Sequence, residues 1–209
     1  MPILFFDTET TGKVDRRKEP QDPAQPDLVQ LAAILTDDDL NEVASLNCII
    51  FPTRWEIPVE AANVHGISQE KAKKYGIALP TALTGFLDLA GLADRFVAHN
   101  IEFDQIIMRR APARIRETAT GDRLVKLLGL GDDPFDGKEC RCTMKAAKPI
   151  LKLPNRNPGI NDAYKFPKLE ECIRHFFNEG IENAHDALAD VRATIRLYRA
   201  LCDHYGMAP

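Results

Sequence analysis

The amino-acid sequence predicts an α/β domain in which helices pack on the faces of one mixed sheet. The first observation is a short apolar run at residues 3–6, typical of a buried strand. The second is a pair of strand-like segments, 28–35 and 42–51, joined by the short polar turn 37–41 as in a β-hairpin. The third is that later strand-like runs are separated by helical patterns. A chain of 209 residues is long enough for one well-packed domain and short for two, so we expect a single domain over residues 1–209.

The remaining elements follow from local signals along the chain, such as Ser68, which is suited to cap the helix that follows it. The predicted strands cover residues 3–6, 28–35, 42–51, 96–98 and 141–143, and the predicted helices cover residues 58–64, 68–75, 80–92, 101–110, 114–128, 168–178 and 186–205. Two segments, 13–27 and 153–167, are rich in turn formers and predict surface loops. Loops of about fifteen residues are uncommon without a function, so we expect both to border a site.

Composition excludes several classes of protein. Hydrophobic residues make up 44% and charged residues 28% of the chain, as in ordinary globular domains, which excludes extensive disorder. No apolar run approaches the ~20 residues of a membrane-spanning helix. The first residues lack the basic stretch of a signal peptide, so we expect a cytoplasmic protein. Cys140 and Cys142 form a C-x-C pair without further ligands nearby, so reduced thiols are favoured over a zinc site.

Two acidic residues stand at the end of the first predicted strand. Asp7 and Glu9 are two residues apart, so in a strand both side chains project to the same side. Adjacent carboxylates repel, and without a partner their pKa values rise or the fold loses stability. A cation between them would remove this repulsion. The alternative is that the strand ends at Phe6 and both acids are solvated in the turn that follows.

A third acid lies on the apolar stripe of a predicted helix. On a helical wheel of residues 101–110, Asp104 falls with Ile107 on the face expected to pack inward. An acid in such a position is uncommon unless it is paired or binds a metal. The alternative is an Asp at the edge of the stripe, in a salt bridge with Arg109 or Arg110.

A fourth acid and a histidine belong to the last predicted helix. Asp190 borders the apolar arc of this helix rather than the polar arc opposite. Asp186 can cap the helix, which places His185 just before the first turn and near Asp190. The alternative is an Asp190 paired with a neighbouring base and a solvated His185.

These four carboxylates occupy positions that core packing alone does not explain. If Asp7, Glu9, Asp104 and Asp190 converge in space, two divalent cations would balance their charge. Oxygen ligands favour Mg²⁺ or Mn²⁺ over zinc. Two such ions about 4 Å apart are the usual apparatus for in-line displacement at a phosphodiester.

The motifs that contain these residues resemble those of the DEDDh family, the DnaQ-like 3′→5′ exonucleases of the RNase H-like superfamily. FDTETTG, HNIEFD and HDALAD match the three exonuclease motifs in order and spacing, and the spacing of His185 to Asp190 resembles the histidine branch. Similarity continues in NVHGIS, CTMK and YKFPKLEEC, so the resemblance covers nearly the whole chain. It implies an RNase H-like fold: a five-stranded mixed sheet with an antiparallel second strand and helices on both faces.

The resemblance also implies a mechanism. The acids Asp7, Glu9, Asp104 and Asp190 would hold two divalent cations, Mg²⁺ or Mn²⁺. His185 would act as the general base that activates water for attack on the terminal phosphodiester of a single strand, and the product would be a nucleoside 5′-monophosphate. The implied substrate-binding residues are Thr10, Thr11, His65, Asn100 and Phe103.

The net charge agrees with this interpretation once the site is loaded. At −4, the chain carries no sequence-wide basic footprint for nucleic acid. Two divalent cations would cancel the charge of the four site acids. We therefore expect the metal site, rather than a long basic groove, to dominate the binding of a strand end.

The resemblance favours the 3′ end of single-stranded DNA as the substrate and a role in DNA repair, alone or beside a separate DNA polymerase. Two alternatives stay open. An RNA 3′-trimming nuclease would use the same metal chemistry, because the distinction depends on contacts with the 2′-hydroxyl. A non-catalytic nucleic-acid-binding module is disfavoured, because all four acids and His185 are present.

Overall fold

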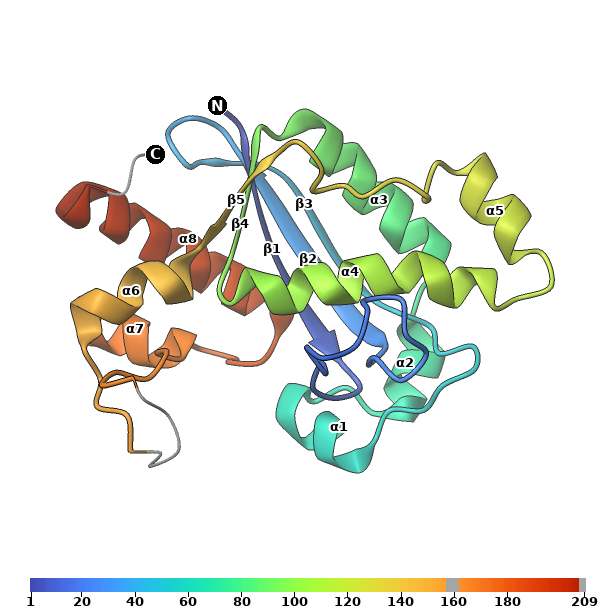
Figure 1. Ribbon diagram of the computed structural model, residues 1–209, viewed down its shortest axis with the longest axis horizontal. Coiled ribbons are helices and arrows are strands. Elements are labelled where there is room, and N and C mark those ends of the chain that lie inside the picture. The colour runs from blue at the N-terminus through green and yellow to red at the C-terminus, as the bar shows by residue number, and fades with distance from the viewer. Residues whose placement is uncertain (157–161, 207–209) are drawn as a thin grey trace.

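In the described residues, 1–156 and 162–206, five strands form one mixed sheet at the centre of this computed structural model (Figure 1). The strands are β1 (Ile3–Thr10), β2 (Leu28–Thr36), β3 (Glu42–Ile49), β4 (Arg95–Ala98) and β5 (Glu139–Cys142). They lie in the order β3-β2-β1-β4-β5. β2 runs antiparallel to β1 and β3, whereas β4 is parallel to β1 and β5. This mixed sheet with an antiparallel second strand confirms the predicted fold class.

Helices cover both faces of the sheet. They are α1 (Val59–His65), α2 (Gln69–Tyr75), α3 (Leu79–Leu92), α4 (Ile101–Arg116), α5 (Gly121–Leu127), α6 (Thr143–Leu151), α7 (Leu169–Phe177) and α8 (Ala187–Tyr205). α3 and α4 pack on one face and α8 on the other, with α6 and α7 beside α8. Within the part of the chain that the structure describes, no helix is both long and apolar enough to cross a bilayer.

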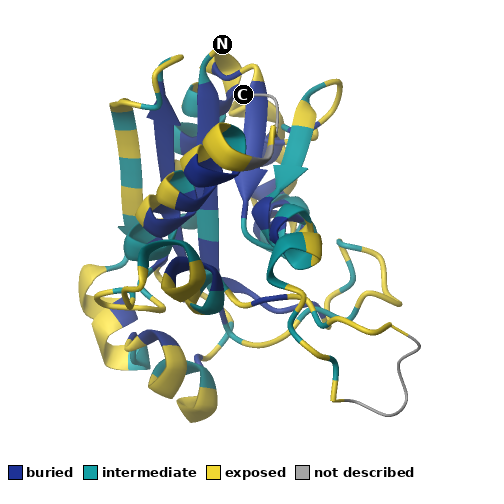
Figure 2. Cartoon of the chain, turned by 90° about the vertical axis from the view of Figure 1, so that its left-hand side faces the viewer, coloured by how far each residue is buried: buried dark blue, intermediate teal, exposed yellow. Residues whose placement is uncertain are grey.

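The alternation of side chains along β1 lets one strand serve both faces. Leu4 and Phe6 belong to the core under α3 and α4, whereas Ile3 and Phe5 belong to the core under α8. Figure 2 shows the central strands largely buried between the helices and the edge strands more exposed, in agreement with the burial of β1, β2 and β4 and the greater exposure of β3 and β5. Because side chains alternate along a strand, the next odd-numbered positions of β1 face α8 and the next even-numbered position faces α4.

Strand β1 continues past Phe6, where the prediction ends, to Thr10. Residues up to Thr10 keep their pairing with β2. Asp7 and Glu9 therefore belong to the strand rather than to a solvated turn. The carboxyl ends of β1 and of its parallel neighbour β4 lie at the same edge of the sheet, the edge at which α/β proteins place ligands.

Helix α4 is also longer than predicted. The sequence pattern predicts separate helices over residues 101–110 and 114–128, but the first helix continues through Pro112 to Arg116. A proline inside a helix removes a backbone hydrogen bond and costs ~3 kcal/mol. The buried stripe of α4 runs without interruption from Ile107 to Ile115, and its packing outweighs this cost. The helix predicted over residues 114–128 is reduced to α5 as a result.

The sequence does not predict α6. Residues 141–143 are predicted as a strand, but β5 ends at Cys142 and Thr143 already belongs to α6. Lysines and Pro149 interrupt the apolar pattern of this helix, although Ala147 is fully buried. The segment is too short, and its apolar pattern too irregular, to predict a helix from the sequence. Its packing against α8 becomes visible only in the structure.

Candidate active site

Asp104, in the first turn of α4, is fixed against the carboxyl end of β1. Its side chain is 2% exposed, and its Oδ1 accepts the backbone N–H of Thr8 at 3.1 Å and the hydroxyl of Thr8 at 2.7 Å. The salt bridge considered from the sequence does not form, because Arg109 and Arg110 pair with other acids. Asp104 is thus a buried carboxylate held by neutral donors.

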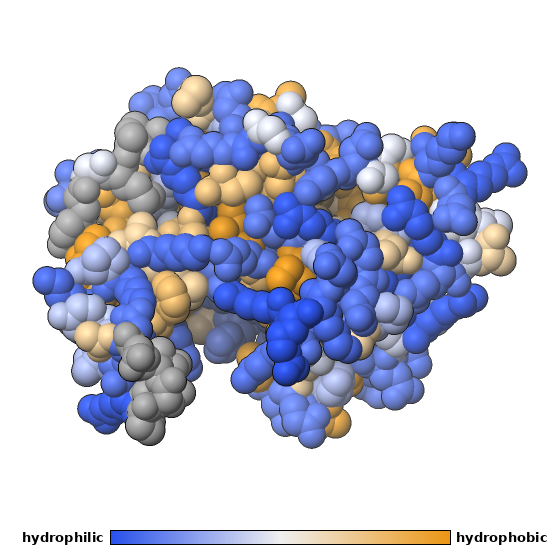
Figure 3. Space-filling model, in the orientation of Figure 1, coloured by the Kyte–Doolittle hydropathy of each residue, from blue (hydrophilic) through white to orange (hydrophobic). Residues whose placement is uncertain are grey.

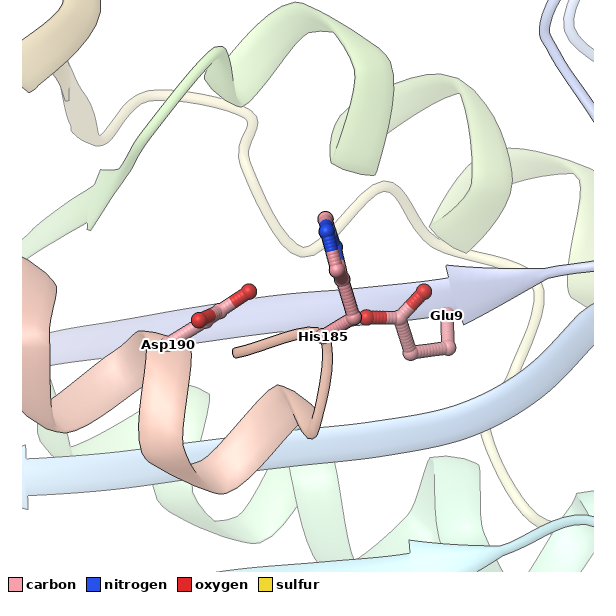
Figure 4. Close-up of side chains that lie close together, drawn as sticks. All are labelled: Glu9, His185 and Asp190. Atoms are coloured by element: carbon pink, nitrogen blue, oxygen red, sulfur yellow. The ribbon is translucent and has the colours of Figure 1, made fainter. Parts of the chain in front are cut away.

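Glu9, His185 and Asp190 form a second group, contributed by β1 and by the start of α8 (Figure 4). One ligand atom of each residue lies within 4.8 Å of the other two. Asp186 caps α8, because its Oδ1 accepts two backbone N–H groups of the first turn. His185 comes just before this cap, with a left-handed φ of 68°, and is exposed. The cap therefore sets where His185 and Asp190 lie.

Burial raises the pKa values of the acids in this region, and neighbouring carboxylates add to the rise for Asp7 and Glu9. Burial raises the pKa of Glu9 to about 8, and the charges of Asp190 and Asp104 add to the rise. Burial raises the pKa of Asp104 to about 7, against the opposing effect of its hydrogen bonds. Burial raises the pKa of Asp190 to about 6, and His185 acts in the opposite direction. The pKa of Asp7 lies well above its ordinary value, because of burial first and the neighbouring carboxylates second.

The side chains fit divalent cations. Oδ1 of Asp190 is buried and has no hydrogen-bond partner. Across residues 1–156 and 162–206, no ion pair includes Asp7, Glu9, Asp104 or Asp190. A set of carboxylate oxygens suits Mg²⁺ or Mn²⁺. The group of Glu9, His185 and Asp190 contains no cysteine, and Cys140 and Cys142 are free thiols.

The four acids and His185 line one cleft of about 440 Å³. It opens between the carboxyl end of β1 and the segment that precedes α7, where the molecular surface is hollowed (Figure 3). Asn100 and Phe103, at the start of α4, form part of its wall. Oδ1 of Asn100 accepts a hydrogen bond of 3.0 Å from Arg16, so the 13–27 loop reaches the rim of the cleft, as expected for a loop that borders a site.

The other residues of the implied substrate-binding set lie elsewhere. Thr10, Thr11 and His65 are not among the described residues that line the cleft. The hydroxyl of Thr10 donates to the carbonyl of Gly12, and the hydroxyl of Thr11 accepts the N–H of Asp27. His65 is buried, its Nδ1 accepts a backbone N–H two residues on, and burial lowers its pKa. The hydroxyls of Thr10 and Thr11 are thus engaged locally, whereas Nε2 of His65 is buried without a hydrogen-bond partner. The expected contact of the nucleotide with the backbone of Thr10 and Thr11 stays a prediction.

His99 is a cleft residue that the sequence does not single out. It follows β4 and is half-buried, with Nδ1 3.0 Å from the hydroxyl of Thr143 and Nε2 3.0 Å from the carbonyl of Pro167. Burial lowers its pKa to about 4, so the ring is neutral at pH 7. Because a carbonyl only accepts, Nε2 carries the proton. His99 thereby ties the segment with Phe166 and Lys168, two further cleft residues, to the sheet.

Comparison with known sequences identifies relatives along nearly the whole chain. A family model described as RNase_T, exonuclease, matches residues 4–198. A protein of Escherichia phage 186, named uncharacterized exonuclease CP81, is 30% identical over 206 residues, which cover 95% of this chain and 87% of that protein.

Solved structures with the same fold include exonuclease I enzymes. The complex of E. coli exonuclease I with a dT13 oligonucleotide has a TM-score of 0.68 and 22% identity over 96% of this chain. Exonuclease I of Methylocaldum szegediense has a TM-score of 0.67 and 22% identity over 99% of this chain. This chain spans 41% of the length of each of these two proteins.

Proposed function

We propose that this chain, which belongs to the RNase T family of exonucleases, is a metal-dependent 3′→5′ exonuclease that releases nucleoside 5′-monophosphates from single-stranded DNA. The observation that carries the proposal is the convergence of four carboxylates and one imidazole on a single cleft. They come from β1, α4 and the start of α8, which are far apart in the sequence. In this proposal residues 1–209 act as a single exonuclease domain.

The proposed metal ligands are Asp7, Glu9, Asp104 and Asp190. When bound, two Mg²⁺ or Mn²⁺ ions would neutralise the charge that develops on the scissile phosphate and its leaving oxygen. Burial raises the pKa values of all four acids, and the neighbouring carboxylates add to the rise for Asp7 and Glu9. A bound cation would replace the protons that these acids otherwise retain near neutral pH.

His185 is the proposed general base. It is exposed at the cleft and close to Glu9 and Asp190, so its imidazole can reach a water molecule beside the strand end. It accepts a proton from that water while the water oxygen attacks the terminal phosphorus in line with the 3′ oxygen of the preceding nucleotide. The bond from phosphorus to that 3′ oxygen breaks, the 3′ oxygen keeps the electron pair and takes a proton from solvent to become the new 3′-hydroxyl, and the terminal nucleoside leaves as its 5′-monophosphate.

Phe103 and Asn100 are the proposed contacts for the terminal nucleotide. Both line the cleft at the start of α4. An aromatic side chain gains about 1–3 kcal/mol by stacking on a base, whatever the base is. E. coli exonuclease I forms complexes with dT13 and with dA16, which supports single-stranded DNA as the substrate class. Proofreading for a separate DNA polymerase, DNA repair and a cytoplasmic location stay predictions from the sequence.

Digestion of oligonucleotides labelled at the 5′ end tests the proposal. DNA and RNA strands with free or blocked 3′ ends are incubated with Mg²⁺, with Mn²⁺ or with a chelator. We expect a ladder of shortened DNA strands that requires a divalent cation and a free 3′ end. Immediate release of the 5′ label, or digestion in the presence of chelator, would contradict the mechanism. Faster digestion of RNA would reassign the substrate.

Two variants separate the enzyme from a contaminating nuclease. Asp104→Asn removes a proposed ligand and should abolish digestion. Asp88→Asn removes the charge of an exposed acid on α3 and should leave digestion unchanged. Equal activity of the two variants would show that Asp104 does not take part.

A further inference from the structure

Gln30 is a buried polar residue of β2 whose side chain bonds to the start of α8. It is 3% exposed. Its Nε2 donates to Oδ1 of Asn47 at 3.0 Å and to Oδ2 of Asp186 at 3.1 Å, and its Oε1 accepts the backbone N–H of Ala187 at 3.3 Å. A carboxylate only accepts and a backbone N–H only donates, so these partners fix the orientation of the amide.

The bonds complete the cap of α8. The first N–H groups of a helix have no partner inside the helix and need acceptors from outside it. Asp186 takes two of them, from Leu188 at 3.1 Å and from Ala189 at 3.2 Å, and Gln30 takes that of Ala187. Gln30 also holds the second oxygen of the capping carboxylate. The cap is therefore shared between β2 and the helix itself.

The same residue lies opposite a proposed metal ligand. Gln30 and Glu9 are register partners in the antiparallel pairing of β1 with β2. Opposite residues in a sheet project to the same face, and here that is the face covered by α8. Gln30 thus links the strand pair that carries Glu9 to the residue that follows His185.

The segment before α8 needs such an anchor. Asn183 has a φ of 55° and His185 has a φ of 68°. Both values lie in the left-handed region of backbone conformation, which residues other than glycine rarely adopt. Such conformations persist where surrounding contacts hold them. Within the segment, the backbone N–H of Asp186 donates to the carbonyl of Asn183. The Gln30 amide adds bonds that join the segment to the sheet.

We propose that Gln30 is a positioning residue for catalysis, which holds His185 at the working distance from the proposed metal ligands by anchoring the cap at Asp186. The inference rests on the proposed function, in which His185 accepts the proton of the attacking water. It concerns the placement of the base more than the binding of cations, because Asp190 is also held by the packing of α8 on the sheet through Ala187 and Val191. It therefore predicts a larger change in turnover than in affinity.

Replacing Gln30 by Met keeps the length of the side chain and removes its three hydrogen bonds. We expect kcat on single-stranded DNA to fall by about tenfold or more, because displacement of a catalytic group by about 1 Å can cost 100-fold. KM for single-stranded DNA should change by no more than about twofold, and so should the Mn²⁺ concentration that gives half-maximal activity. Thr36→Val is the matched control, since it removes a buried hydroxyl at the far end of β2, where Thr36 donates to the carbonyl of Ile3. It should leave kcat unchanged.

An exchange of partners supplies the rescue. Gln30→Glu places a second carboxylate against Asp186 and should lower kcat by about tenfold or more. In the double variant Gln30→Glu with Asp186→Asn, the donor and acceptor roles are reversed at the same total charge. Asn caps a helix as well as Asp does, and its amide N–H₂ can donate to Glu at position 30. We expect kcat of the double variant to recover to within about threefold of the wild type.

Hydrogen exchange of the backbone supplies a readout that is independent of activity. Amides of residues 185–190 should exchange at least about tenfold faster in Gln30→Met, and at wild-type rates in the double variant. Unchanged kcat and unchanged exchange in Gln30→Met would overturn the inference, as would a double variant no better than Gln30→Glu. A wild-type protein inactive on every strand would contradict the proposed function instead, and the exchange rates would still decide whether Gln30 anchors the segment.

Discussion

Replacing Asp104 by Asn should stabilise the protein once divalent cations are removed. The pKa of Asp104 rises from an ordinary value of 3.8 to about 7, and each unit corresponds to ~1.4 kcal/mol. Below the pKa that Asp104 has in the unfolded chain, its raised folded-state pKa contributes fully to stability. This contribution is lost as the pH rises through about 7, the pKa in the folded protein. At pH 8.5 the ionised side chain therefore costs the folded state up to ~4 kcal/mol relative to the unfolded chain.

An asparagine avoids most of this cost. Its amide oxygen can accept both hydrogen bonds that Thr8 now donates to Oδ1 of Asp104. Its amide N–H₂ still needs an acceptor, so we expect a net gain of about 2–3 kcal/mol at pH 8.5. For a chain of this size the melting temperature should rise by roughly 5–10 °C.

The measurement is thermal unfolding of chelator-treated protein at pH 5 and at pH 8.5. The advantage of Asp104→Asn should be larger at pH 8.5 than at pH 5, because the wild-type side chain stays protonated in the folded state at the lower pH. Asp88→Asn, at an exposed position, should melt with the wild type at both values. A variant that melts at or below the wild-type temperature at pH 8.5 would refute the electrostatic argument.

Three further predictions concern the same cleft. Chelator-treated wild-type protein should lose stability between pH 5.5 and pH 8.5. The reason is that the pKa values of Asp190 and Glu9 are raised to about 6 and about 8, so both acids must ionise in the folded state over this range. Added Mn²⁺ should restore the melting temperature, and a melting temperature that does not change with pH would contradict this prediction. His185→Ala should keep Mn²⁺ binding, measured by calorimetry, but lose about 100-fold or more in kcat, and near-native turnover would refute its assigned role. His99→Phe should release the carbonyl of Pro167 and so loosen the cleft segment that His99 ties to the sheet. We expect KM for single-stranded DNA to rise by a larger factor than kcat falls. Steady-state kinetics in which kcat falls by the larger factor would show that His99 does not support substrate binding.

Local periodicity predicted the direction of the acidic side chains well. The period of two along β1 placed Asp7 and Glu9 on one side, and the helical wheel placed Asp104 on the buried stripe of α4. Both patterns depend only on backbone geometry within one element, which a single sequence records. The proximity of His185 and Asp190 could be predicted in the same way, because only a helix cap and one helical turn separate them along the chain.

Contacts between distant elements could not be predicted in this way. Gln30 bonds to Asp186 across 156 positions of the chain, and His99 bonds to Pro167 across 68. A buried polar side chain leaves no periodic signal, because its partner is set by how the elements pack rather than by its own neighbours. The helix end predicted at residue 110 shows the opposite error, since tertiary packing carries α4 through Pro112 to Arg116.

The central place of β1 in the sheet divides the site into two mechanical parts. β1 is paired with β4 through Ile3 to Phe5 and with β2 along its whole length, including Asp7 and Glu9, so these two acids move only if the pairing of β1 with β2 opens. His185 lies outside the sheet, and its position depends on the hydrogen bonds of Gln30 and Asp186 at the start of α8. A mutation at the start of α8 can therefore displace His185, with Asp190 in the same first turn, while Asp7 and Glu9 keep their places in the sheet.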